Sequence, residues 1–198
     1  MYDVVGVIDV HSYTRIYDGK ASNTACGESI ESVRSTAPFP ILLPKALPDG
    51  YSLQSVDYVP NVYVIMQYFT RSLCDPEHPY SPDEGVIEIV EGPLKLASDA
   101  RDGEEYVQRA IAGYQESGLN AKSYVFQDGR MKAVGYGAGI GSSKAIDENG
   151  TVVHQEQFDF AAHLWVIDDK TGTIVKIEAR STDIPLEQLA AIGESLEQ

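Results

Sequence analysis

The stretch FPILLPKALPDGYSLQSVDYVPNVYVIMQYFTR, residues 39–71, decides much of the fold. It opens with a proline-punctuated run, in which each proline fixes its own φ angle and biases the residue before it towards an extended conformation. The turn Pro48-Asp49-Gly50 follows. Two strand-like runs, Tyr51–Val59 and Val62–Thr70, are then joined by Pro60-Asn61. The pattern predicts an extended segment over residues 38–47, which we call the lead-in, followed by a β-hairpin.

The rest of the chain alternates between strand-like runs and turn signals, with two helical segments. Asp102–Gly118 and Pro185–Leu196 place apolar side chains at helical spacing. Strand-like runs are found at Val86–Glu91, Ala121–Gln127, Arg130–Tyr136, Val152–Gln157, Phe158–Asp168 and Thr173–Arg180. Because strands and helices do not alternate in βαβ units, we expect an α+β fold: a mainly antiparallel, curved sheet on which two amphipathic helices pack.

The length and net charge of the chain limit the number of domains it can form and the classes of partner it can bind. With 198 residues, 43% hydrophobic and 23% charged, the chain suits one globular domain. We expect an α+β domain over residues 38–198, preceded by an N-terminal extension, residues 1–37, within the same fold. A formal charge of -15 argues against nucleic acid or an anionic membrane as partner, and solubility explains it equally well. We expect no transmembrane segment, because no apolar run approaches the ~20 residues needed.

No motif specifies catalysis, a cofactor or a metal. Gly135–Lys144 is glycine-rich, but its spacing does not fit a nucleotide-binding loop, and it is typical of a flexible loop. His154, Glu156 and His163 could supply three zinc ligands, yet their spacing matches no strong motif. Glu88 and Glu91 are most simply the polar decoration of a strand. We therefore predict a protein that is not an enzyme, with no catalytic residue, metal ligand or cofactor.

Tyrosine is the most biased residue type, with 12 Tyr against five Phe and one Trp. Tyrosine is common in strands that have one solvent-exposed face, so a half-exposed sheet is the favoured explanation of this bias. A tyrosine-lined binding surface is the alternative. The candidate contact surface for a partner combines strand tyrosines with an acidic loop: Tyr58, Tyr63, Tyr68, Asp75, Glu77 and Glu84.

The two cysteines leave two states open. In an oxidising compartment Cys26 and Cys74 would close a long loop, worth about 4 kcal/mol in the chain-entropy model. In a reducing compartment they would be two thiols. Their spacing fits neither a redox pair nor a four-ligand zinc site.

Two segments resemble a bacterial domain-of-unknown-function family, found at the extracytoplasmic C-terminal ends of anti-sigma factors and in secreted lipoproteins. The first lies within the proline-rich stretch quoted above, with Leu47-Pro48-Asp49-Gly50-Tyr51 as its most specific part. The second is Ala162–Leu196, in which Trp165, Leu186-Glu187-Gln188-Leu189 and Glu194-Ser195-Leu196 carry the similarity. The resemblance covers both ends of residues 38–198 in the same order.

The resemblance implies a location outside the cytoplasmic membrane, either secreted or anchored through a segment absent from this chain. It implies a sensing or protein-interaction role without established catalytic residues, and it favours a disulfide between Cys26 and Cys74. We therefore expect a non-catalytic extracytoplasmic module that binds a protein or envelope ligand. The alternative is a carrier of lipid or another small apolar ligand, held between the sheet and the helices.

Overall fold

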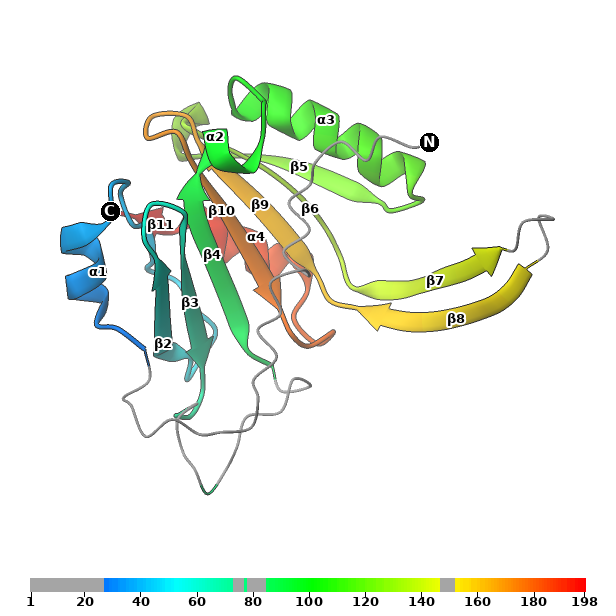
Figure 1. The fold of residues 1–198 in the computed structure, drawn as a ribbon, viewed down its shortest axis with the longest axis horizontal. Coiled ribbons are helices and arrows are strands. Elements are labelled where there is room, and N and C mark those ends of the chain that lie inside the picture. The colour runs from blue at the N-terminus through cyan, green and yellow to red at the C-terminus, as the bar shows by residue number, and fades with distance from the viewer. Residues whose placement is uncertain (1–26, 73–76, 78–84, 147–151) are drawn as a thin grey trace.

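The protein is an α+β fold built on one antiparallel sheet (Figure 1). A computed structural model describes residues 27–72, 77, 85–146 and 152–198. The sheet has seven strands in the order β2-β3-β4-β10-β9-β6-β5. Their bounds are β2 Ser52–Val59, β3 Tyr63–Phe69, β4 Ile87–Pro93, β5 Ala121–Phe126, β6 Met131–Tyr136, β9 His163–Asp168 and β10 Thr173–Ala179. The expected fold class is confirmed.

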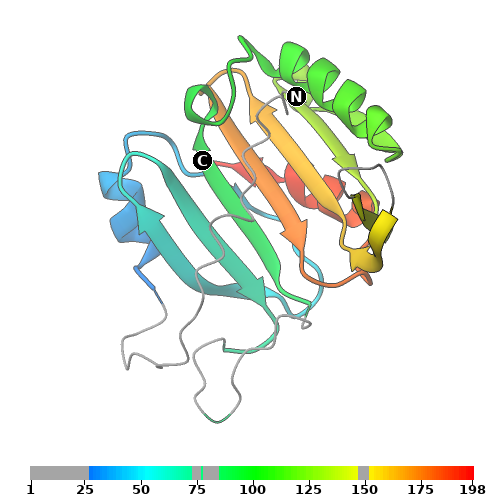
Figure 2. The same ribbon diagram turned by 45° about the vertical axis from the view of Figure 1, so that its right-hand side comes forward.

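Helices lie on both faces of this sheet. α3 (Gly103–Glu116) covers one face and α4 (Leu186–Glu194) the other (Figure 2). The shorter helices are α1 (Ile30–Thr36), α2 (Leu94–Ala97) and the 3-10 turn η2 (Gln127–Gly129). α3 begins where the Asp102 carboxylate accepts a hydrogen bond from the N–H of Glu105 at 2.9 Å. Both predicted amphipathic helices are therefore present.

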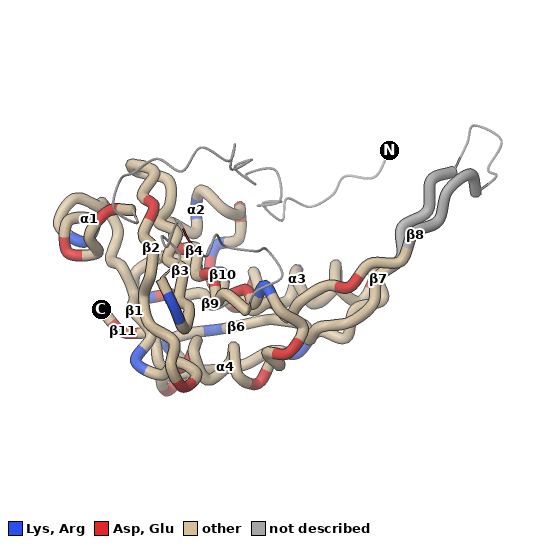
Figure 3. The backbone as a smooth tube through the Cα atoms, turned by 90° about the horizontal axis from the view of Figure 1, so that it is seen from below, with Lys and Arg blue, Asp and Glu red and all other residues tan. Residues whose placement is uncertain are grey.

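Two small antiparallel sheets accompany the large one. β1 (Leu43–Pro44) pairs with β11 (Leu196–Glu197). β7 (Gly139–Ile146) pairs with β8 (Val152–Phe160) and forms a ribbon that leaves the body, which we call the β7–β8 arm (Figures 1 and 3).

The arm corrects the expectation of a flexible loop at Gly135–Lys144, because most of this segment lies in β6 and β7. Its glycines make room for aromatic rings on the paired strand. A Cβ atom at Gly141 would lie 2.6 Å from the Phe158 ring, and one at Gly139 would lie 2.8 Å from the Phe160 ring. Glycine opposite an aromatic residue is a known device for stabilising a strand pair.

The larger core lies between the sheet and α4. Inward side chains of the central strands meet the apolar stripe of the helix, and all are nearly or fully inaccessible: Met66, Ile89, Leu164, Ile177, Leu189 and Ile192. Val33 of α1 belongs to the same core, and Gly27 bridges to Val56 on the edge strand β2. Part of the N-terminal extension thus packs on the sheet, while residues 1–26 lie outside the described chain.

The proline-rich lead-in crosses the α4 face of the sheet, and its amides find specific partners there. Prolines carry no N–H, so only the other residues need acceptors. Leu42 donates its N–H to the Glu91 carboxyl group, at 2.9 Å to Oε2 and 3.2 Å to Oε1. Lys45 and Ala46 donate to the backbone and side-chain oxygens of Ser195, after the end of α4. The lead-in and the C-terminal helix therefore form one cover on the sheet.

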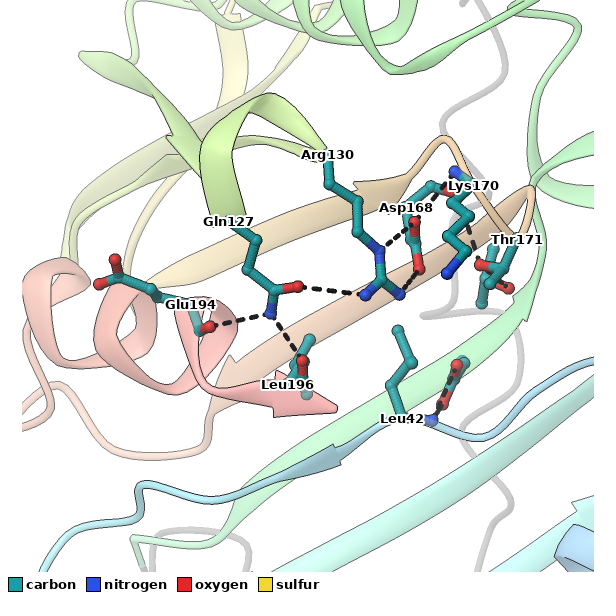
Figure 4. Close-up of polar contacts among 10 residues, drawn as sticks. Leu42, Gln127, Arg130, Asp168, Lys170, Thr171, Glu194 and Leu196 are labelled. Atoms are coloured by element: carbon teal, nitrogen blue, oxygen red, sulfur yellow. Dashed lines mark hydrogen bonds and ion pairs between the residues drawn. The ribbon is translucent and has the colours of Figure 1, made fainter. Parts of the chain in front are cut away.

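A polar network ties the end of this cover to the β9–β10 turn (Figure 4). Arg130 forms a two-pronged ion pair with Asp168, whose carboxylate is buried. Burial alone would raise the pKa of Asp168, but hydrogen bonds from Arg130 and from the N–H of Lys170 outweigh it and lower that pKa. Gln127 donates to the carbonyl oxygens of Glu194 and Leu196, which fixes the C-terminal end of α4.

Glu91 is not the surface decoration that its strand pattern indicates, because it lies on the α4 face and is fully buried. Burial, the largest effect, raises its pKa well above the ordinary value, and the negative charge of Asp168 adds to this. The Leu42 N–H and the Arg34 guanidinium act in the opposite direction.

Within the described residues, no helix combines the length and apolar character that crossing a bilayer needs.

The raised pKa of Glu91 makes a prediction about stability. Glu91 contributes its full share to the free energy of unfolding below its unfolded-state pKa of about 4.3. This contribution is lost as pH rises towards the raised folded-state pKa. Glu91→Gln keeps an acceptor for Leu42 but cannot ionise. We expect the stability of this variant relative to wild type to grow with pH, by up to about 1.4 kcal/mol per pH unit. Urea unfolding between pH 4 and 8 measures this, and a pH-independent difference would contradict it.

Candidate functional site

The tyrosines of the predicted contact surface do not share one face. Tyr68 is 4% exposed and points into the core under α4, with its hydroxyl 3.8 Å from the Met66 sulfur. Tyr58 packs against the same core from β2. Tyr63 is odd-numbered in β3 and lies on the opposite face from Tyr68. Burial, followed by the charge of Glu91, raises the pKa of Tyr68.

The other predicted site residues fall in or near the segment that the structure does not describe. Glu77 is described and exposed. Asp75, Glu84, Cys26 and Cys74 lie outside the described residues, so the acidic contact surface and the disulfide stay predictions.

The most concentrated polar chemistry lies on the sheet face that carries α3, in one row across the strands. We call it the polar row. Neighbouring strands place its members directly opposite one another, in the order Gln67 (β3), Glu88 (β4), Glu178 (β10), His163 (β9) and Tyr136 (β6). α3 packs on β5, β6 and β9, and α2 packs on β4 and β10 near the other end of the strands. The row therefore crosses the strands beyond α2, and its β6 end meets α3, where the ring of Tyr136 contacts that of Tyr114.

Two carboxylates face each other in this row, an arrangement that costs free energy unless cations compensate it. Arg180 lies 3.1 Å from Glu88, and Gln67 donates to the same carboxylate at 3.2 Å. Lys176 lies 2.5 Å from Glu178. Glu88, Glu178 and Lys176 are each 6–7% exposed, so these charges interact in a weakly screened environment.

His163 is a further neighbour that stabilises the negative charge of Glu178. Its Nε2 atom lies 3.5 Å from Oε1 of Glu178. Burial alone would raise the pKa of Glu178, but the electrostatic effect of the neighbouring His163, together with the Lys176 ammonium and the Arg180 guanidinium, outweighs burial and lowers it. Glu178 is therefore held as a carboxylate at neutral pH, and the row is a network of charge pairs.

Aromatic rings connect the row to the base of the arm. The Tyr136 ring stacks on the His163 ring at 5.1 Å and meets the rings of Tyr114 and Phe160 edge-on at 5.1 and 5.7 Å. Trp165, beside the row, packs in the same apolar cluster as Tyr114, and its ring lies 6.4 Å from that of Tyr106. Burial raises the pKa of Tyr114 to about 12, so this hydroxyl stays neutral. The arm thus leaves the body from a packed aromatic base.

Beyond this base, the arm exposes apolar side chains on both of its faces. Phe158, over Gly141, is 48% exposed, and Ile140, on the opposite face of the ribbon, is 72% exposed. A two-stranded ribbon buries little apolar surface of its own. These two side chains are therefore available for contact with another molecule.

Two of the three residues in the histidine hypothesis for zinc have side chains outside the described part of the structure. His163 contributes to the polar row, while the side chains of His154 and Glu156 lie outside the description. Within the described part of the chain, no group of three His, Cys, Asp or Glu side chains has the geometry to hold a metal ion.

The sequence contained a signal for the polar row that went unused. In β10, Lys176 and Glu178 alternate with Val175 and Ile177, so one strand face is apolar and the other charged. The partners of these charges come from β4 and β9. Only the strand order, which is not sequential, brings them together.

Comparisons with known proteins add no family to this description. No family model, curated protein or solved structure matches the chain. The fold and the polar row therefore stand on the physical arguments given above.

The buried pair in the polar row gives a stability prediction. Glu178→Gln leaves the Lys176 ammonium group buried without its carboxylate, and we expect a loss of about 3 kcal/mol at pH 7. Because the pKa of Glu178 is lowered, its contribution is present above the unfolded-state pKa and is lost as pH falls through the folded-state pKa. The difference between variant and wild type should therefore shrink in acid.

Urea unfolding at pH 7 and in acid tests this prediction. The double variant Lys176→Met/Glu178→Leu removes both charges and is the control, which should recover most of the lost stability. A single variant as stable as wild type at pH 7 would contradict the pairing.

Proposed function

We propose that the protein is a non-catalytic interaction module that binds a partner protein through the β7–β8 arm. The observation that carries this proposal is the arm itself: a ribbon that leaves the body and exposes Ile140 and Phe158. Its base is fixed by the aromatic contacts of Tyr136, so the arm is presented on a rigid support. An anchored element with exposed apolar groups loses less conformational entropy on binding than a free segment.

The chemistry of the polar row supports a binding role over a catalytic one. A general acid or base works best with a pKa near the working pH. Glu178 has its pKa shifted away from neutrality, and Lys176 is paired with it. Glu88 is paired with Arg180. The row is better suited to fixing the shape of the sheet face than to moving protons.

An extracytoplasmic setting, with Cys26 and Cys74 joined, is part of the proposal. The resemblance of the two end segments supports it. In the fold these segments are neighbours, because the lead-in pairs with the C-terminal segment through β1 and β11. The carrier alternative has no comparable support, since fully buried side chains such as Leu164 and Leu189 occupy the space between sheet and α4.

The test uses capture of native partners from envelope extracts on the immobilised full chain. Burial of one aliphatic side chain contributes about 1.5–3 kcal/mol, so Ile140→Ser should weaken capture of the partner about tenfold or more. Phe158→Ser provides a second variant on the other face of the arm. Quantitative mass spectrometry of the eluates measures the change.

Val125→Ser is the matched control, because Val125 is 65% exposed but lies on the edge strand β5, away from the arm. The control should capture the partner as wild type does. Equal capture by the arm variants and wild type would overturn the role of the arm. Failure to capture any protein, together with turnover in a broad hydrolase screen, would overturn the interaction module itself.

A further inference from the structure

A groove of about 640 Å³ lies at the end of the sheet opposite the polar row. Four separate parts of the chain line it: the lead-in, the β2–β3 turn, α2 with the loop that follows it, and the β9–β10 turn. The groove opens to solvent, which suits an extended segment rather than an enclosed small molecule.

The charge of this groove differs from that of the chain. Acidic residues outnumber basic ones by 30 to 15 in the sequence. The charged residues that line the groove are nevertheless both basic, Lys95 and Arg101. Arg101 forms an ion pair with Glu105 at 2.7 Å, whereas Lys95 has no ion-pair partner among the described residues. Lys95 is therefore the cation available to an occupant.

An apolar strip lies beside this cation. Leu96 is 52% exposed, and Pro38 is also exposed on the facing wall. The floor of the groove is formed by buried side chains, because Phe39 and Leu94 are only 8% and 5% exposed. An occupant that carries both a carboxylate and an apolar side chain would match the two kinds of surface together.

The walls of the groove are held in place before anything binds. The N–H of Leu94 donates to the carbonyl of Gly172 at 2.8 Å, which joins α2 to the β9–β10 turn. The Asp168 carboxylate accepts from the N–H of Lys170 in the same turn (Figure 4). Prolines at 38, 40 and 93 restrict the remaining backbone. A preformed groove reduces the entropy that binding must overcome.

We propose that this groove binds an extended acidic segment of a partner protein, with a carboxylate on Lys95 and an apolar side chain on Leu96. The inference rests on the proposed function as an interaction module, but it places a second contact far from the arm. Charge complementarity selects the acidic partner locally, although the chain as a whole is acidic.

The experiment selects peptides from a random twelve-residue display library on the immobilised full chain. Enriched peptides should combine acidic with apolar residues. Affinity of a labelled, enriched peptide is then measured by fluorescence anisotropy. We expect Lys95→Glu to weaken binding about tenfold or more and Leu96→Ser to weaken it severalfold.

Lys122→Glu is the charge-matched control, because Lys122 lies on the edge strand β5 and changes the net charge equally. It should bind within about twofold of wild type. Enrichment of basic peptides, no enrichment, or equal loss in both charge variants would overturn the groove proposal. Peptides that lose affinity with Ile140→Ser but not with Lys95→Glu would support the arm and overturn the groove, so the two proposals fail separately.

Discussion

The hydrogen bond from the Leu42 amide to the buried carboxyl group of Glu91 is the constraint on which the rest of the fold depends. An extended, proline-rich segment makes few backbone hydrogen bonds of its own, so it packs on a sheet only where its remaining amides find acceptors. Glu91 supplies one acceptor from the middle of the sheet, and Ser195 supplies two more beyond α4. The cover over the core is thereby assembled from both ends of the residue 38–198 region.

This arrangement gives the two faces of the sheet different roles. The α4 face is closed by the lead-in and the terminal helix, and its side chains are apolar apart from a few buried, partnered groups such as Glu91 and Asp168. The α3 face is divided between a small apolar core around Trp165 and the polar row. The two proposed contact elements lie at opposite ends of the strands: the β7–β8 arm near the polar row, and the groove by the turns.

Local signals predicted the elements of the fold, whereas contacts between distant segments decided the site. The strand-like runs Ala121–Gln127 and Arg130–Tyr136 predicted β5 and β6, and the segment Asp102–Gly118 predicted α3, because strand, turn and cap preferences act within a few residues. The burial of Glu91 could not be read locally, since its partner lies 49 residues away. Glycines at 139 and 141 suggested a loop because their aromatic partners lie on the returning strand. The polar row required a strand order that no local pattern encodes.

Native-state hydrogen exchange at the Leu42 amide tests the central constraint most directly. Amides that open only with the whole molecule exchange slowest, and exposed loop amides exchange fastest. With Leu42 donating to Glu91, its amide should be protected to within about tenfold of Ile177 in β10, while the exposed Asp49 exchanges freely. Exchange of Leu42 as fast as Asp49, with Ile177 still protected, would show that the lead-in is not fastened to the sheet and would contradict this account.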